Sequence, residues 1–224
     1  MPLSSREYSA GEELADRVIH RLGIAVAVVG VAVLLWLAAG RRNFTLFVGV
    51  ALYGVGLLTM LVASALANHD RSERSRNLEL RERFDHAAIF LMIAGTYTPF
   101  TLTVLAGPWG WGLLVFVWTV ALLGAGLKLV GRLGYTPAIG LYLLMGWSVL
   151  PALEPLVNRL PLPPLVLLVA GGILYTLGIL VFVLSRLPYH TVIWHAMVIA
   201  AAGCHYAAVL MGVVLPHSAA VGVY

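Results

Sequence analysis

Charged side chains are scarce in this chain of 224 residues, and cysteine is almost absent. Asp, Glu, Lys and Arg together make up 11% of the sequence, whereas soluble domains carry about 25%. So few charges could not cover the surface of a water-soluble globule, and the 61% of apolar residues excludes a disordered chain. The single cysteine, Cys204, excludes an internal disulfide framework and a four-thiolate metal site. These absences leave an integral membrane protein as the predicted class.

Long apolar stretches recur along the chain, and each is long enough to cross a membrane. A helix needs roughly 20 apolar residues to span a hydrocarbon core of about 30 Å. The alternating pattern of a membrane β-barrel is missing from the sequence, so the spans are predicted to be helices. The predicted fold class is all-α, a bundle of seven transmembrane helices in a single domain, 1–224, whose residues 1–21 form an amphipathic segment. The seven spans are predicted at 22–40, 44–67, 86–107, 108–127, 133–153, 164–184 and 192–214.

The positive charges are distributed unevenly about these spans. Eleven of the 14 Lys and Arg residues lie in the amino-terminal segment and in the second, fourth and sixth connections. Positive residues favour the cytoplasmic side of a membrane. The amino terminus is therefore predicted to be cytoplasmic and the carboxy terminus outside, in a multi-pass protein of the cell's inner (plasma) membrane. The same bias accounts for the net charge of +4, so no nucleic-acid partner is expected.

Polar and ionisable residues gather where four of the predicted spans meet the cytoplasmic side. Such groups are costly at membrane depth and usually face the interior of a bundle, so their convergence predicts a site. Histidines with a carboxylate and no nearby cysteine suit zinc. The alternative is that these histidines lie at the headgroup level as ordinary amphipathic residues. The residues are His20 before the first span, Ser64, Asn68 and His69 at the end of the second, Asp85 and His86 at the start of the third, and His190, Thr191 and His195 at the start of the seventh.

Two of these histidines, His190 and His195, have an unfavourable spacing for one regular helix. Five residues rotate the second side chain about 140° away from the first. The metal-binding pair on a helix is spaced i, i+4, and Thr191 occupies that position relative to His195. His190 is therefore expected to contribute a ligand only if the helix starts near it.

Five segments along the chain carry further motifs. They are Glu12-Glu13…His20, Phe84-Asp85-His86, Ile93-Ala94-Gly95-Thr96-Tyr97-Thr98-Pro99-Phe100, Met145-Gly146-Trp147 and Leu187-Pro188-Tyr189…Ile193-Trp194-His195…Cys204-His205. In this order they resemble the hemolysin III family, which belongs with the progestin and adipoQ receptors (PAQR). The resemblance implies seven membrane helices with the amino terminus inside. It also implies a zinc site of three histidines, in Ser-x-x-x-His on the second helix and His-x-x-x-His on the seventh, with an Asp starting the third.

Two of the three histidine positions implied by this resemblance hold other residues, Asn68 and Thr191. Each replacement has a histidine beside it in the sequence, His69 after Asn68 and His190 before Thr191. A shift of one residue rotates a helical side chain by about 100°, so two interpretations stand: a zinc site displaced toward the cytoplasm, or a decayed site. For the displaced site, the predicted metal ligands are His69, His190 and His195, and the predicted catalytic residues are Asp85, which would assist a bound water, and Ser64.

Three functions are compatible with the sequence, all with membrane lipids as partners and zinc as the candidate cofactor. The first is a non-catalytic role in membrane-lipid or membrane-energetics homeostasis, which needs no complete metal site. The second is a zinc-dependent hydrolase of a lipid amide or ester, because the resemblance extends to a superfamily that includes lipid amidases. The third is a pore-forming cytolysin, although no amphipathic pore-lining span is evident in the sequence. The replaced histidine positions favour the first.

Overall fold

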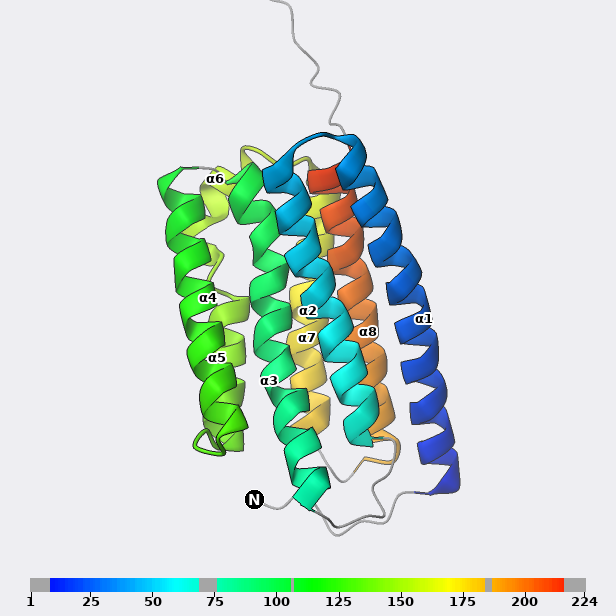
Figure 1. The fold of residues 1–224 in the computed structure, drawn as a ribbon. Coiled ribbons are helices and arrows are strands. Elements are labelled where there is room, and N and C mark those ends of the chain that lie inside the picture. The colour runs from blue at the N-terminus through cyan, green and yellow to red at the C-terminus, as the bar shows by residue number, and fades with distance from the viewer. Residues whose placement is uncertain (1–8, 69–75, 106, 184–186, 216–224) are drawn as a thin grey trace, which may run out of the picture.

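The computed structural model describes residues 9–68, 76–105, 107–183 and 187–215, and every element in these ranges is helical (Figure 1). Seven helical segments are long and apolar enough to cross a membrane. The predicted all-α fold with seven spans is therefore confirmed. The elements are α1 (Ala10–Gly40), α2 (Phe44–Asn68), α3 (Arg76–Pro99), η1 (Phe100–Val104), α4 (Pro108–Leu129), α5 (Tyr135–Gly146), η2 (Leu150–Ala152), α6 (Leu153–Val157), α7 (Leu162–Val183), α8 (His190–Val209) and η3 (Leu210–Val214).

The first helix begins at Ala10, well before the predicted boundary at residue 22. A capping box defines its start: the Ser9 hydroxyl accepts the Glu12 backbone N–H at 3.2 Å, and the Glu12 carboxylate accepts the Ser9 backbone N–H at 2.8 Å. Glu12 and Asp16, two of the acidic residues in this part, are buried. The segment from Ala10 onward is thus the first part of α1, and these two carboxylates are buried within the bundle.

The breaks between helices follow glycine and proline. The boundary between the third and fourth spans lies at Gly107 and Pro108, as predicted: Gly107 has a φ of 87°, which glycine adopts without strain, and Pro108 occupies the first turn of α4, where a missing N–H costs nothing. The fifth span was predicted as one helix but is interrupted after Gly146. The chain continues through η2 and α6, and Pro151 within η2 cannot donate a helical hydrogen bond.

Successive spans run antiparallel (Figure 1). The end of α2 and the starts of α3 and α8 therefore lie at the same end of the bundle as the start of α1, the end that the charge distribution predicts to be cytoplasmic. The third span is central, with 61% of its apolar stretch buried, whereas only 11% of α7 is buried and this helix lies at the periphery. The polar helix ends predicted to converge are thus brought to one end of the bundle.

Glycines bring the backbones of α2 and α3 into contact. A Cβ added at Gly56 would lie 2.9 Å from the backbone oxygen of Leu91, and one added at Gly95 would lie 2.9 Å from the backbone oxygen of Leu52. Small residues allow this close approach in membrane bundles, where packing rather than the hydrophobic effect holds helices together. Gly95, part of the 93–100 motif, is therefore required by the packing of α2 against α3.

Candidate metal centre

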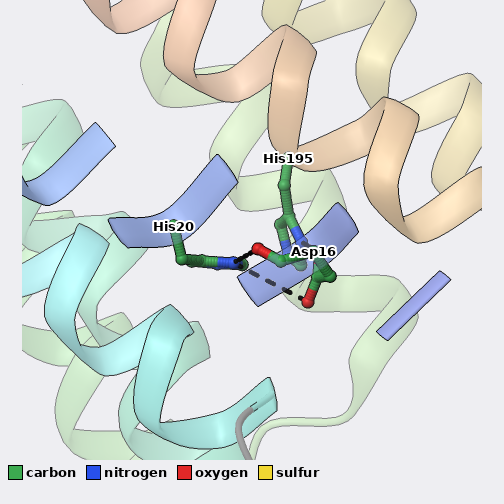
Figure 2. Close-up of side chains that lie close together, drawn as sticks. All are labelled: Asp16, His20 and His195. Atoms are coloured by element: carbon green, nitrogen blue, oxygen red, sulfur yellow. Dashed lines mark hydrogen bonds and ion pairs between the residues drawn. The ribbon is translucent and has the colours of Figure 1, made fainter. Parts of the chain in front are cut away.

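Three buried side chains from the two ends of the chain form a compact cluster: Asp16 and His20 of α1, and His195 of α8 (Figure 2). One candidate ligand atom from each lies within 4.8 Å of those of the other two. Asp16 and His20 are spaced i, i+4, so both project from the inner face of α1. His195 reaches them from the second turn of α8. We call this group the Asp16–His20–His195 cluster.

Hydrogen bonds orient both imidazole rings. His195 Nδ1 donates to the Asp16 carboxylate at 2.5 Å, and His20 Nδ1 donates to the Asp16 backbone oxygen at 2.9 Å. The ring centroids are 4.4 Å apart. With its Nδ1 carrying a proton, each neutral ring presents Nε2 as its lone-pair nitrogen. Orientation of a histidine by a carboxylate or a backbone oxygen in this way is typical of metal ligands.

The two Nε2 atoms converge on Ser64 of α2. His20 Nε2 lies 3.2 Å and His195 Nε2 lies 3.4 Å from the Ser64 hydroxyl oxygen. A hydroxyl has one proton and can donate it to only one of these nitrogens. Two imidazole lone pairs directed toward one point suit a divalent metal such as zinc. The Asp16 carboxylate lies at the other ring nitrogen of His195, Nδ1, and would join this donor set only by giving up that hydrogen bond.

A second contact between α1 and α8 supports the cluster. The buried Glu12 carboxylate accepts the Tyr189 backbone N–H at 2.7 Å, in addition to the Ser9 N–H of the capping box. Tyr189 precedes α8 and has a left-handed φ of 57°. Glu12 therefore ties the start of α8 to the first turn of α1, one turn before Asp16.

Replacing Glu12 with glutamine is expected to lower the thermal stability of the protein. The two backbone N–H groups are bonded to different oxygens of the Glu12 carboxylate, and glutamine has only one side-chain oxygen, without charge. One buried donor would therefore lose its partner, which costs about 1–3 kcal/mol, or roughly 3–10 °C in Tm for a chain of this size. The change is measurable by thermal unfolding in detergent. Glu13→Gln is the matched control, because Glu13 is exposed beside Glu12; equal Tm values for the two variants would contradict the tie.

The structure brings together some of the site residues predicted from the sequence and places the others elsewhere. Ser64 and His195 come together at the Asp16–His20–His195 cluster. His190 is the first residue of α8, which meets the condition set by its spacing, but its Nδ1 donates to the Leu187 backbone oxygen at 3.2 Å and it is not a member of the cluster. Asp85 lies on α3 and lines the central cavity. His69 lies outside the described residues.

Sequence reasoning noted His20 but did not assign Asp16 and His20 as ligands. The signal was present in the spacing: Glu12, Asp16 and His20 recur at every fourth position, and the small residues Gly23 and Ala27 continue the buried face of α1. This period places the three polar residues on the face that packs into the bundle, where a polar residue needs a partner.

A large cavity of about 770 Å³ runs between the helices beside the cluster. Side chains of α2, α3, α5, α7 and α8 line it, and most of them are apolar. Its polar lining includes His20, Ser64 and His195, so the cluster forms part of the cavity wall. The volume lies within the range of small-molecule sites, roughly 300–1,000 Å³.

Fold and site together define a polytopic membrane protein with a buried, metal-capable cluster in the wall of an apolar cavity. The family model described as "Haemolysin-III related" matches residues 8–206, and the chain belongs to this family. The matched part contains Asp16, His20, Ser64 and His195. The predicted family resemblance is therefore confirmed.

Individual relatives agree with this assignment. The chain is 34% identical to "Hemolysin-3" of Bacillus cereus over 203 residues, which cover 89% of this chain and 90% of the relative. It is 33% identical to the "Hemolysin-3 homolog" of Bacillus subtilis (strain 168), covering 91% and 95% of the two chains. It is also similar, at 27% identity, to the human "Monocyte to macrophage differentiation factor", over 88% of this chain and 83% of the relative.

Proposed function

We propose that this protein binds zinc at the Asp16–His20–His195 cluster and a membrane lipid in the adjacent cavity, and that it serves membrane-lipid homeostasis in the cell's inner membrane. The observation that carries the proposal is that the cluster and the cavity share two residues. His20 and His195 belong both to the cluster and to the cavity lining. A ligand in the cavity would therefore touch residues that hold the metal.

The donor set supports zinc as the metal. Two imidazoles and one carboxylate are common zinc ligands, and three protein ligands leave a position for another group. To bind a metal held by His195 Nε2, the Asp16 carboxylate would have to leave its hydrogen bond to His195 Nδ1; otherwise it would orient His195 from outside the ligand set. When bound, zinc supplies a Lewis acid that polarises an oxygen of water or of a carbonyl group.

The lining of the cavity supports a lipid as the ligand. Apolar side chains of α3, α5 and α7 suit a hydrocarbon chain, whereas polar residues are concentrated near the ends of α2 and the starts of α3 and α8. An amphiphile would place its polar head at that end and its chain between the helices. Membrane lipids are the abundant amphiphiles around seven apolar spans.

The proposal predicts about one zinc ion per chain and retained lipid after purification in a mild detergent. Elemental analysis measures the metal, and native mass spectrometry measures the lipid. Zinc at trace level together with a lipid-free chain would contradict both parts.

Deleting the gene in the parent organism is expected to change the acyl-lipid profile, which lipid mass spectrometry would detect.

Gly172→Leu is expected to lower lipid occupancy of the cavity about tenfold, equivalent to about 1.4 kcal/mol, without lowering zinc content. Gly172 lines the cavity, and a Cβ there would meet only the ring of Trp147, at 3.9 Å. A Cβ is therefore accommodated in ordinary contact, and the rest of the leucine side chain would occupy space in the cavity. Gly112→Leu is the matched control, since a Cβ at Gly112 meets nothing within 4 Å. Undiminished lipid in Gly172→Leu would argue against binding in this cavity.

Hydrolysis of a lipid ester or amide is a second candidate function, favoured by the position of Ser64. Its hydroxyl lies within hydrogen-bond reach of His20 and His195 and faces the cavity. It is placed to donate to an oxygen of a bound carbonyl group, and Asp85, also in the lining, could accept a proton from water. Cleavage of a lipid amide or ester by the purified protein, lost in Ser64→Ala and in Asp85→Ala, would establish it. Absence of cleavage from zinc-loaded protein would leave the homeostasis role.

A further inference from the structure

One whole face of α7 lines the cavity. Its lining residues recur one turn apart from Leu165 to Phe182, which is the spacing of a single helix face. These two residues are 17 positions apart, about 26 Å along a regular helix. Because the hydrocarbon core of a membrane is about 30 Å thick, the cavity extends through most of that core and well past its middle.

The two ends of the cavity differ in chemistry. At the Phe182 end, the end of α2 and the start of α8 supply polar lining residues such as Asn68 and Thr191. We call this the polar end. At the Leu165 end, the lining comes from η1, α4 and α6 and is apolar. It includes Phe100, Leu113 and Leu156, which are buried, so the cavity meets packed apolar side chains there.

Hydroxyl groups in the cavity lining use their protons within the protein. Each of five lining hydroxyls donates to a backbone oxygen, at distances between 2.7 and 3.1 Å. They belong to Thr96, Tyr97, Thr101, Tyr142 and Thr176. The Tyr175 hydroxyl and His205 Nδ1 are buried and do not reach the cavity. The wall beyond the polar end therefore offers a ligand mainly methyl groups, methylene groups and rings.

The dimensions of the cavity limit the ligand to one chain. A methylene group needs roughly the space of a water molecule, about 30 Å³, so the cavity of about 770 Å³ holds roughly 25 such groups. An extended chain advances about 1.3 Å per bond, since three backbone bonds span about 3.8 Å. A chain that covers 26 Å therefore has about 20 carbons. Two chains of that length would need more volume than the cavity has.

We propose that the cavity binds a single-chain amphiphile whose unbranched hydrocarbon chain has about 20–22 carbons and carries no polar substituent. Its head lies at the polar end, and its chain ends against Phe100 and Leu156. A shorter chain leaves the outer part of the cavity empty, so the wall there loses dispersion contacts. A polar group along the chain would lie against a wall that offers it no partner. The inference rests on the proposed lipid binding in this cavity and names the class of the lipid.

The test offers the purified full chain, in detergent, an equimolar mixture of monolaurin, monopalmitin and monobehenin. These amphiphiles differ only in the length of a saturated chain, and their uncharged glycerol head avoids repulsion from the lining carboxylates of Glu82 and Asp85. All three dissolve in the same micelles, so a difference in the amounts bound, measured by native mass spectrometry, reflects the cavity. We expect at least about tenfold more bound monobehenin, the longest, than monolaurin, the shortest, equivalent to about 1.4 kcal/mol. The reason is that its additional methylenes fill space that otherwise stays empty.

Gly172→Leu is expected to remove this preference. Gly172 lies on the cavity face of α7, ten residues or about 15 Å from Phe182. A side chain at this point blocks the outer part of the cavity and leaves room for the chain of monolaurin. The ratio of bound monobehenin to bound monolaurin should fall at least about tenfold, whereas Gly112→Leu, at a position outside the lining, should keep the wild-type ratio.

The outcomes separate this inference from the proposed function. Equal binding of the three amphiphiles by the wild-type chain, or a preference for a shorter one, would overturn the inference and leave the proposed lipid binding standing. This comparison needs no variant. A preference for monobehenin that Gly172→Leu leaves unchanged would overturn the inference as well. Binding of none of the three would overturn the proposed lipid binding together with it.

Discussion

His195→Ala is expected to lower the affinity of the protein for zinc by at least about 100-fold. His195 contributes one of the two nitrogens that converge beside Ser64, and its ring is oriented by Asp16. Removing residues that only orient a metal ligand already costs 10–100-fold in affinity, so loss of the ligand itself should cost more. Titration of metal-free protein with zinc against a competing chelator measures the effect.

Two companion variants decide which histidines hold the metal. If the Asp16–His20–His195 cluster binds zinc, His20→Ala should weaken binding as strongly as His195→Ala. His190→Ala should then bind nearly as well as wild type, because His190 is not in the cluster. The reverse result, with affinity lost in His190→Ala and kept in His20→Ala, would favour the set of His69, His190 and His195 predicted from the sequence. Zinc affinity that no variant changes would argue against both sites.

Gly95→Leu is expected to destabilise the bundle by about 3 kcal/mol or more, which corresponds to roughly 6–12 °C in Tm. The new side chain would have to enter the contact between α2 and α3, where even a Cβ lies 2.9 Å from the backbone oxygen of Leu52. Backbone cannot move aside as a flexible side chain can. The two helices must therefore separate, and the most buried span of the protein loses its packing.

The matched control is Gly126→Leu, on the exposed side of α4, where a Cβ meets nothing within 4 Å. It should leave Tm within about 2 °C of wild type, since surface substitutions are usually within ±0.5 kcal/mol. Thermal unfolding in detergent, followed by circular dichroism, distinguishes the two variants. Similar Tm values for both would show that the glycine at position 95 is not needed for close packing.

Most of the fold was readable from the sequence because hydrophobicity and length are properties of each segment alone. The seven spans and the break at Gly107 and Pro108 follow from local composition. The helix α1 begins twelve residues before the apolar span predicted at 22–40, and the buried carboxylates of Glu12 and Asp16 lie in this earlier part. Glu12 and Asp16 are buried against α8, which supplies a partner for each: the Tyr189 N–H for Glu12 and the His195 ring for Asp16.

Part of the candidate site could be predicted from the sequence. Ser64 and His195 were named from their motif positions, and the structure brings them together, while the catalytic role of Ser64 and Asp85 stays a prediction. The partners of His195 could not be found in this way. Asp16 is 179 residues away in the chain, and the i, i+4 spacing of Asp16 and His20 shows that they share a face without showing which helix that face meets.

The sequence by itself determined that this is a membrane protein, how many spans it has and at which end of the bundle polar residues gather. These three properties depend on the composition of each segment, summed over neighbouring residues. Only the tertiary structure decided which polar residues share a site. Each residue turns the side chain by about 100° around a helix, so a small rotation of one helix against another exchanges its partners. Packing sets those rotations, through contacts such as Gly95 against α2 and Glu12 against the start of α8. The cluster of Asp16, His20 and His195 is the result of that packing.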